Sequence, residues 1–224
     1  MTTPLLTGNP ARRPRARSGW RLAAALVLLA AVPLIAGTLR LLQLAGGPEL
    51  IPADHRFDTV PIPVAAHITG SVVYALAGAL QFVPRFRRSH PRWHRRTGRL
   101  LVAAGLVVAT SALWMTLTYP TKPGTGDLLF ASRLVAGTAM TACLVLGFTA
   151  ARRRAFTSHR AWMIRAYALA LAAGTQAFTE GIGGAVFGHS VLVADLSKAA
   201  AWVINLAVAE WAIHRQKPTT ALRP

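Results

Sequence analysis

Six long apolar segments, separated by short polar connections, constrain the fold of this 224-residue chain more than any other feature. They cover residues 20–42, 64–83, 100–119, 128–150, 161–178 and 191–213. A helix needs about 20 apolar residues to cross the hydrocarbon core of a bilayer. The runs are rich in Ala and Leu and lack the alternation of barrel strands, whereas helices satisfy their own backbone hydrogen bonds in lipid. The sequence therefore predicts an all-α, polytopic transmembrane helical bundle of about six spans.

Two similar stretches suggest how the middle spans are arranged. Residues 89–100, "SHPRWHRRTGRL", and residues 158–169, "SHRAWMIRAYAL", are identical at five of twelve aligned positions. The same offset places span two on span four and span three on span five, which predicts a four-helix core made of spans two to five. Basic loops also resemble one another without any repeat, so this alternative stays open.

The composition agrees with a membrane protein and excludes a nucleic-acid-binding domain. Apolar residues make up 53 % of the chain and charged residues 14 %, yet the formal net charge is +18. Soluble domains carry about 25 % charged residues. A nucleic-acid binder needs a solvated basic face on a polar domain, but here the basic residues lie in short blocks between apolar runs. The expected partners are the lipid bilayer and anionic lipids at its cytoplasmic face, with no nucleic acid.

The basic residues also predict an orientation. Twenty of the 25 Lys and Arg residues fall in four blocks that alternate spans place on one side: residues 12–21, 85–99, 152–165 and 215–223. The positive-inside rule makes that side cytoplasmic. The chain is then expected to be a protein of the bacterial inner membrane, with both termini in the cytoplasm. The first span could instead be a signal peptide, whose cleavage would leave five spans in the same topology.

This topology divides the chain into three parts. We expect a basic cytoplasmic tail over residues 1–19, a single transmembrane domain over residues 20–215, and a cytoplasmic tail over residues 216–224.

Two histidines at the cytoplasmic face are the first candidate ligands. Pro91 suits a helix N-terminus, so His94 should lie in the first turn of the helix that enters span three. Ser158 is a suitable N-cap, which would make His159 the first residue of the fifth helix. Histidines at one depth on facing helices can ligate a haem iron from both sides. The alternative is that they are interfacial histidines in solvated basic loops, which is also how we interpret His90.

A polar face along span two is the second candidate. Its members recur at 4-3-4-3 spacing, which places them on one side of a helix facing the bundle interior: His67, Ser71, Tyr74, Gly78 and Gln81. Such a face can serve either helix packing or a polar site. His67 belongs near the outer end, about 25 Å of helix from the inner histidines.

Charged residues inside the spans need partners, because an ionisable group at mid-bilayer costs about 2.5–3.5 kcal/mol or more. We expect Arg133 to pair with Asp127 or Glu180, and Asp195 to pair with Lys198 three residues later. The predicted polar membrane site comprises His67, Tyr74, Gln81, Arg133 and Glu180.

Two long stretches resemble a known family: "AHITGSVVYALAGALQFVPRFRRSHPRWHRRTGRLLV" and "SHRAWMIRAYALALAAGTQ". They are similar to the bacterial predicted-membrane-protein family called domain of unknown function 2306 (DUF2306), over about residues 64–180. The motif residues are His67, Gly78, Gln81, His94, Gly98, Arg99, His159, Trp162, Met163 and Arg165. The resemblance implies a polytopic membrane protein and supplies no established reaction.

A looser likeness is to cytochrome b561 and ferric-reductase cores, in which four helices hold b haems between histidines. Span four of this chain has no histidine, so that scheme leaves one haem b, with His94 and His159 as its iron ligands. The leading hypothesis is a redox protein that exchanges electrons with a quinone or another redox partner, with His67 near an outer quinone or proton site. The alternatives are a small proton-coupled transporter using His67, Gln81, Arg133 and Glu180, and a non-catalytic assembly factor. No residue is assigned a catalytic role.

Overall fold

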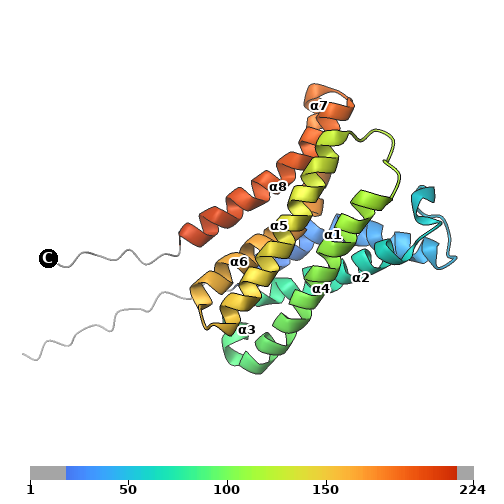
Figure 1. The fold of residues 1–224 in the computed structure, drawn as a ribbon. Helices are drawn as coiled ribbons and strands as arrows, with labels where there is room; N and C mark the ends of the chain where they lie inside the picture. The colour runs from blue at the N-terminus through green and yellow to red at the C-terminus, as the bar shows by residue number, and fades with distance from the viewer. Residues whose placement is uncertain (1–18, 216–224) are drawn as a thin grey trace, which may run out of the picture.

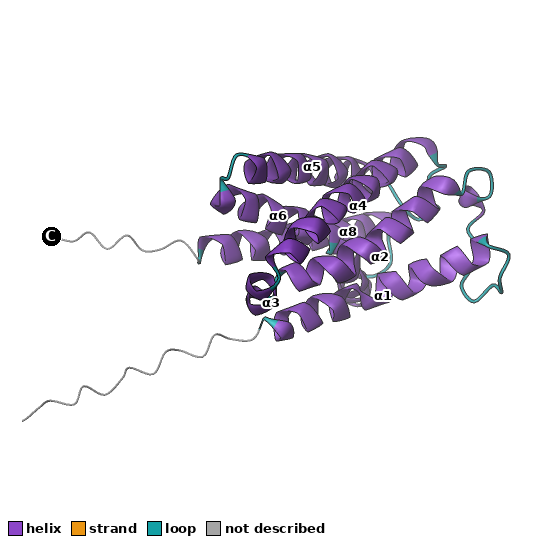
Figure 2. Cartoon of the chain, turned by 90° about the horizontal axis from the view of Figure 1, so that it is seen from below, coloured by secondary structure: helices purple, strands orange, loops and turns teal. Residues whose placement is uncertain are grey.

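The computed structural model describes residues 19–215, which form eight α-helices and one 3-10 turn (Figures 1 and 2). The elements are α1 (Trp20–Leu44), η1 (His55–Phe57), α2 (Ile62–Gln81), α3 (Pro84–Ser89), α4 (Pro91–Thr118), α5 (Asp127–Arg152), α6 (Phe156–Ala170), α7 (Ala172–Phe187) and α8 (Val191–His214). No strand occurs among these residues, which confirms the all-α prediction. The two predicted tails lie almost entirely outside the described residues.

Five of the described helices are long and apolar enough to cross a membrane: α1, α2, α4, α5 and α8. The predicted fifth span is instead divided at Leu171 into α6 and α7, which have 15 and 16 residues. A Cβ on Gly174 would lie 2.1 Å from the carbonyl oxygen of Leu29, so glycine lets α7 approach the α1 backbone closely. Near the break, the side-chain amide of Asn205 donates a hydrogen bond to the Ala168 carbonyl (3.0 Å). The expectation of six uninterrupted spans thus becomes five candidate spans and one broken helix.

The connections between the helices alternate between two ends of the bundle (Figure 2). The short helix α3, the α5–α6 turn and the end of α8 lie at one end, which we call the inner end. The α1–α2 and α4–α5 loops lie at the other, the outer end. The basic stretches 85–99 and 152–165 therefore gather at the inner end of the bundle.

Four helices form a ring around the core. Helix α2 packs on α4, α4 on α5 and α5 on α6, and α6 returns to contact α2, so α4 and α6 stand diagonally opposite each other. Helix α1 covers α2 and α7, while α8 packs on α5, α6 and α7. Large apolar side chains such as Leu28, Val135 and Val203 remain exposed at 76 %, 68 % and 67 %. Apolar exposure on this scale is expected where helices face lipid instead of water.

The α1–α2 loop at the outer end is held by polar contacts. Arg56 forms an ion pair with Asp54 at 2.6 Å, and the Tyr119 hydroxyl donates a hydrogen bond to the Val60 carbonyl at 2.6 Å. The hydrogen bond from the Arg56 side chain holds the pKa of Asp54 below its ordinary value. The loop is therefore tied both to itself and to the end of α4.

A buried carboxylate joins α8 to the start of α5. Asp195 is 1 % exposed, and its carboxylate accepts hydrogen bonds from the backbone N–H groups of Gly126 (3.0 Å) and Leu129 (3.0 Å). These are among the N–H groups that a helix start leaves without partners, and the positive end of the helix dipole favours an anion there. The predicted pair between Asp195 and Lys198 is therefore wrong, because Lys198 contacts Glu180 instead, with 2.7 Å between Nζ and Oε2.

Replacing Asp195 with alanine should destabilise the bundle strongly. The change leaves the N–H groups of Gly126, the N-cap of α5, and of Leu129, which is buried, without an acceptor, and we expect a loss of about 2–3 kcal/mol. Thermal unfolding of the purified protein in detergent measures this loss. Asp127→Ala is the matched control, because Asp127 lies at the same helix end but is exposed. Equal losses in the two variants would contradict the capping role of Asp195.

Candidate functional site

The inner end of α4 carries the first predicted ligand. His94 lies in the first turn of α4, as predicted, because Pro91 begins that helix. Its Nδ1 forms a hydrogen bond with Oε1 of Gln81, the last residue of α2. The intervening helix α3 reverses the chain, so the end of α2 meets the start of α4.

His159 occupies the matching place on α6. Its Nδ1 forms a hydrogen bond of 2.8 Å with the carbonyl oxygen of Gly147 on α5. A Cβ on Gly147 would lie 2.1 Å from Cε of Met163, so glycine allows α5 and α6 to pack this closely. The predicted N-cap is wrong: α6 begins at Phe156, which places His159 fourth in the helix, because the chain resumes helical form directly after the tight turn at residues 153–155.

The two imidazoles share one hydrogen-bonding pattern. In each ring, Nδ1 faces an oxygen acceptor, so the neutral imidazole carries its proton on Nδ1 and its lone pair on Nε2. Metal-bound histidines are oriented in this way by their second hydrogen bond. His94 and His159 lie in the first turns of α4 and α6, the helices that stand diagonally opposite each other in the ring.

Two further observations concern the surroundings of His94. The side-chain Nε2 of Gln81 is buried and has no hydrogen-bond partner among the described residues. Leaving such a donor unpaired costs about 1–3 kcal/mol. Gly98 lies one turn after His94 on the same face of α4, and nothing lies within 4 Å of the position that its Cβ would occupy. The site therefore offers imidazole nitrogens, an amide donor and an open helix surface.

The surroundings of the inner site are positively charged. Arg87 of α3 and Arg95 of α4 lie in the same basic stretch as His94, and Arg160 directly follows His159 on α6. Within residues 19–215, no group of three or more His, Cys, Asp or Glu side chains is placed to hold a metal ion. The inner end of the bundle is therefore rich in positive charge.

The predicted polar face of span two does point into the bundle. His67 Nδ1 lies 3.0 Å from the carbonyl oxygen of Val108 and 3.2 Å from the hydroxyl of Ser111, both on α4. The Tyr74 ring is 4 % exposed, and its centroid lies 5.7 Å from that of Tyr167. These residues hold α2 against α4 and α6, and neither joins the inner histidines.

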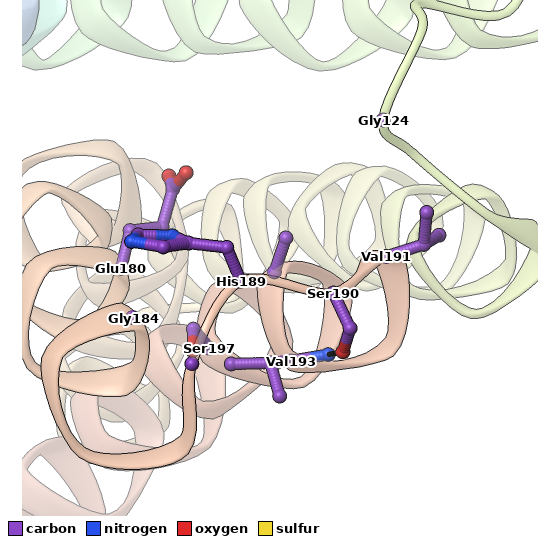
Figure 3. Close-up of a pocket in the computed structure, with 10 residues that line it drawn as sticks. Gly124, Glu180, Gly184, His189, Ser190, Val191, Val193 and Ser197 are labelled. Atoms are coloured by element: carbon purple, nitrogen blue, oxygen red, sulfur yellow. Dashed lines mark hydrogen bonds between the residues drawn. The ribbon is translucent and has the colours of Figure 1, made fainter.

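A pocket of about 400 Å³ opens at the outer end between α7 and α8 (Figure 3). Glu180 and His189 lie side by side on its wall, with Gly124 of the α4–α5 loop across from them. Glu180 forms its ion pair with Lys198, which the sequence analysis did not predict.

Arg133 does not form its predicted ion pair. Among the described residues it has no salt bridge or side-chain hydrogen bond, although it lies in the field of Asp195 and Glu180. The predicted pairs are wrong because Glu180 forms an ion pair with Lys198 instead, and Asp127 is exposed at the start of α5.

A second interhelical ion pair lies toward the inner end. Arg165 of α6 donates to Glu210 of α8, with 2.9 Å between Nη2 and Oε2, and its guanidinium lies 4.8 Å from the Trp162 ring centroid. Arg165 and Trp162 are both motif residues of the family resemblance, but the pairing of Arg165 with Glu210 was not predicted from the sequence. The signal in the sequence that could have predicted this ion pair is the presence of opposite charges near the inner ends of two predicted spans.

The five residues of the predicted polar site therefore lie in separate places. Gln81 lies with His94 at the inner end, His67 and Tyr74 lie on the α2 face, and Glu180 lies at the outer pocket. Arg133 lies on α5 and has no ion pair among the described residues. The two predicted haem ligands, by contrast, lie at the same end of the ring.

The helices of the bundle have exposed apolar faces, and most of the charges in its interior are paired. These are the properties of an integral membrane protein that crosses the bilayer several times. The profile of the family described as "Predicted membrane protein (DUF2306)" matches residues 64–213, and the chain belongs to this family. The match extends beyond the predicted residues 64–180 and includes nearly all of α8. Neither the curated proteins nor the solved structures contain a match to the chain.

Gly78 should not tolerate a methyl group. A Cβ there would lie 2.4 Å from Cε2 of Tyr167, whose hydroxyl is fixed by a 2.7 Å hydrogen bond to the Ala75 carbonyl. Gly78→Ala should therefore destabilise the protein by about 1–3 kcal/mol in thermal unfolding. Gly181 on α7 faces open space, so Gly181→Ala should be neutral or stabilising by about 0.5–1 kcal/mol. A stable Gly78→Ala variant would show that the Tyr167 ring can move.

Proposed function

We propose that this protein is a redox protein of the bacterial inner membrane that binds one b-type haem between His94 and His159. The observation that supports the proposal is that the two imidazoles have matching positions and matching hydrogen bonds. They stand on diagonal helices at one end of the ring, and each has Nδ1 held by an oxygen and Nε2 left as the lone-pair nitrogen. When bound, the haem would supply reversible one-electron transfer.

The chain's own residues would have distinct tasks at this site. Gln81 and the Gly147 carbonyl would orient the two ligand rings and raise the basicity of their Nε2 atoms. Arg87 and Arg160 would offer positive charge to the carboxylates of the haem. Gly98 would keep the α4 surface open beside His94.

The packing of the core favours one haem at the inner end. The centroid of the Phe82 ring lies 5.0 Å from that of Tyr167, and the centroid of the Tyr74 ring lies 5.7 Å from it. These rings fill the space between α2 and α6. His67 remains the candidate contact for a quinone or proton near the outer face, because its Nδ1 is also held by oxygens.

The proton-coupled transporter ranks second. The Glu180–Lys198 pair beside the outer pocket supports it, but the other residues proposed for its path lie elsewhere. The assembly factor has no specific contact in its favour.

The visible spectrum tests haem binding directly. After expression with ample haem, we expect Soret and α bands in the dithionite-reduced protein, and we expect their loss in His94→Ala and His159→Ala. His90→Ala is the matched control, because His90 is an exposed histidine of the same basic stretch that bonds to Ser89. Absence of both bands from the wild-type protein, or their survival in both ligand variants, would contradict the proposal.

We further propose that both termini are cytoplasmic and that α6 and α7 cross the membrane together as one broken span. Single-cysteine variants in a Cys143→Ser background test this topology in intact cells with a membrane-impermeant maleimide. We expect labelling of Thr121→Cys and Phe187→Cys but not of Ser89→Cys or Arg153→Cys, all of which replace exposed residues. Protection of Phe187→Cys together with labelling of Thr121→Cys would refute the broken span.

A further inference from the structure

Arg133 lies on the face of α5 that points into the bundle. It stands four residues after Leu129 and three before Ala136, which are 1 % and 9 % exposed, and this spacing places all three on one side of the helix. At Leu129 this face meets α8 through the hydrogen bond to Asp195, and at Gly137 it packs closely on α4. The Arg133 side chain therefore starts between α4 and α8 and not on a lipid-facing side of α5.

The guanidinium of Arg133 is an exception among the charges of the interior. Within residues 19–215 it forms no ion pair and no side-chain hydrogen bond. Other charged groups between the helices have partners within the protein: Lys198 with Glu180, Arg165 with Glu210, and Asp195 with the first N–H groups of α5. An unpaired charge inside a membrane span is costly and is retained mainly where it has a use.

The nitrogens of Arg133 are accessible, although the side chain starts on an interior face. Among the described residues that are not exposed, Gln81 Nε2 is the one side-chain nitrogen or oxygen that is both inaccessible and unpaired. The Arg133 nitrogens are unpaired too, so space that admits at least a water molecule must adjoin them. That space lies toward the outer end, because Arg133 is six residues, about 9 Å of helix, from the start of α5, and helical side chains tilt toward the N-terminus of their helix.

We propose that Arg133 binds an oxyanion, the phosphate or carboxylate group of a ligand that arrives from the outer side of the membrane. A guanidinium presents its N–H donors in a planar fork that can give either group two parallel hydrogen bonds. The carboxylates of Asp195 and Glu180 are already engaged, so the oxyanion would supply the negative charge that Arg133 lacks.

The proposed oxyanion site is separate from the proposed haem site. Arg133 lies in the outer half of α5, whereas His94 and His159 lie at the inner end of the bundle. Loss of haem binding would leave Arg133 unchanged, and the measurements below do not use the haem spectrum, so the two proposals fail independently.

Arginine labelling of the full-length protein in dodecyl maltoside micelles tests the proposal. Phenylglyoxal reacts with free guanidinium groups, and mass spectrometry of peptides locates the adducts. In plain micelles with a Tris chloride buffer, we expect Arg133 to be labelled. Several-fold protection of Arg133 by added inorganic phosphate or succinate would identify a soluble ligand. The same protection by phosphatidylglycerol in the micelles, without a soluble oxyanion, would identify a lipid headgroup.

Arg40 and Arg56 are internal controls near the outer end. Their guanidinium groups already donate to oxygens of Pro52 and Asp54, so their labelling should be the same in every condition. Labelling of Arg133 that no addition reduces would overturn the proposal. If Arg133 is unlabelled in plain micelles, release of one phospholipid or organic anion per protein on unfolding supports the proposal, and the absence of such a molecule overturns it.

Two methionine variants separate ligand binding from a structural role. Arg133→Met should leave the midpoint of thermal unfolding in plain micelles unchanged or raise it, because it removes an unpaired charge. Arg165→Met, the matched control, should lower the midpoint by several degrees, because Glu210 loses its partner. The addition that protects Arg133 should raise the midpoint of the wild-type protein more than that of Arg133→Met, since a ligand stabilises only the state that binds it. A fall in Arg133→Met as large as that in Arg165→Met would show that Arg133 holds the helices together, and would overturn the proposal.

Discussion

In the hydrocarbon core of a bilayer there is no water to accept or donate a hydrogen bond, so a polar group must find its partner within the protein. This constraint explains most of the side-chain contacts in the structure. Asp195 faces the first N–H groups of α5, Asn205 faces the Ala168 carbonyl near the break between α6 and α7, and Tyr167 donates to the Ala75 carbonyl. Each contact joins two different helices, so the polar groups that are costly in lipid also determine which helices are neighbours.

Glycine makes these contacts possible by letting helices approach one another closely. A Cβ on Gly105 would lie 2.7 Å from the Tyr74 ring, and one on Gly174 would lie 2.1 Å from a backbone oxygen of α1. Association of helices in lipid depends on van der Waals packing and hydrogen bonds, because burial of apolar surface gains little there. The small residues of the ring are therefore as important to its stability as the large ones. The same close packing between α5 and α6 brings His159 to the Gly147 carbonyl.

The departures from this constraint mark where function is expected. Gln81 keeps a buried amide nitrogen without a partner in the described part of the chain, and it does so beside His94. Arg133 is half-buried and has no ion-pair partner within residues 19–215. Glu180 and Lys198 form a pair at the outer pocket whose two members differ in their access to water. A chain that satisfies its other polar groups this thoroughly retains such features at a cost, and the first of them lies beside one of the two proposed haem ligands.

The sequence by itself determined the helical class, the approximate bounds of most helices and the placement of the basic stretches at one end. These properties follow from the length of the apolar runs and from the short connections between them, both of which are local. It also indicated His94 and His159 as a pair at one end. Only the tertiary structure decided which charges pair, since Lys198 could reach Asp195 along its own helix yet contacts Glu180 on α7. The close approach of α7 to α1 at Gly174 and Leu29 is likewise a contact between distant segments, which local sequence does not specify. A local pattern specifies a helix, but the partner of a buried charge is chosen by whichever helices the packing brings beside it.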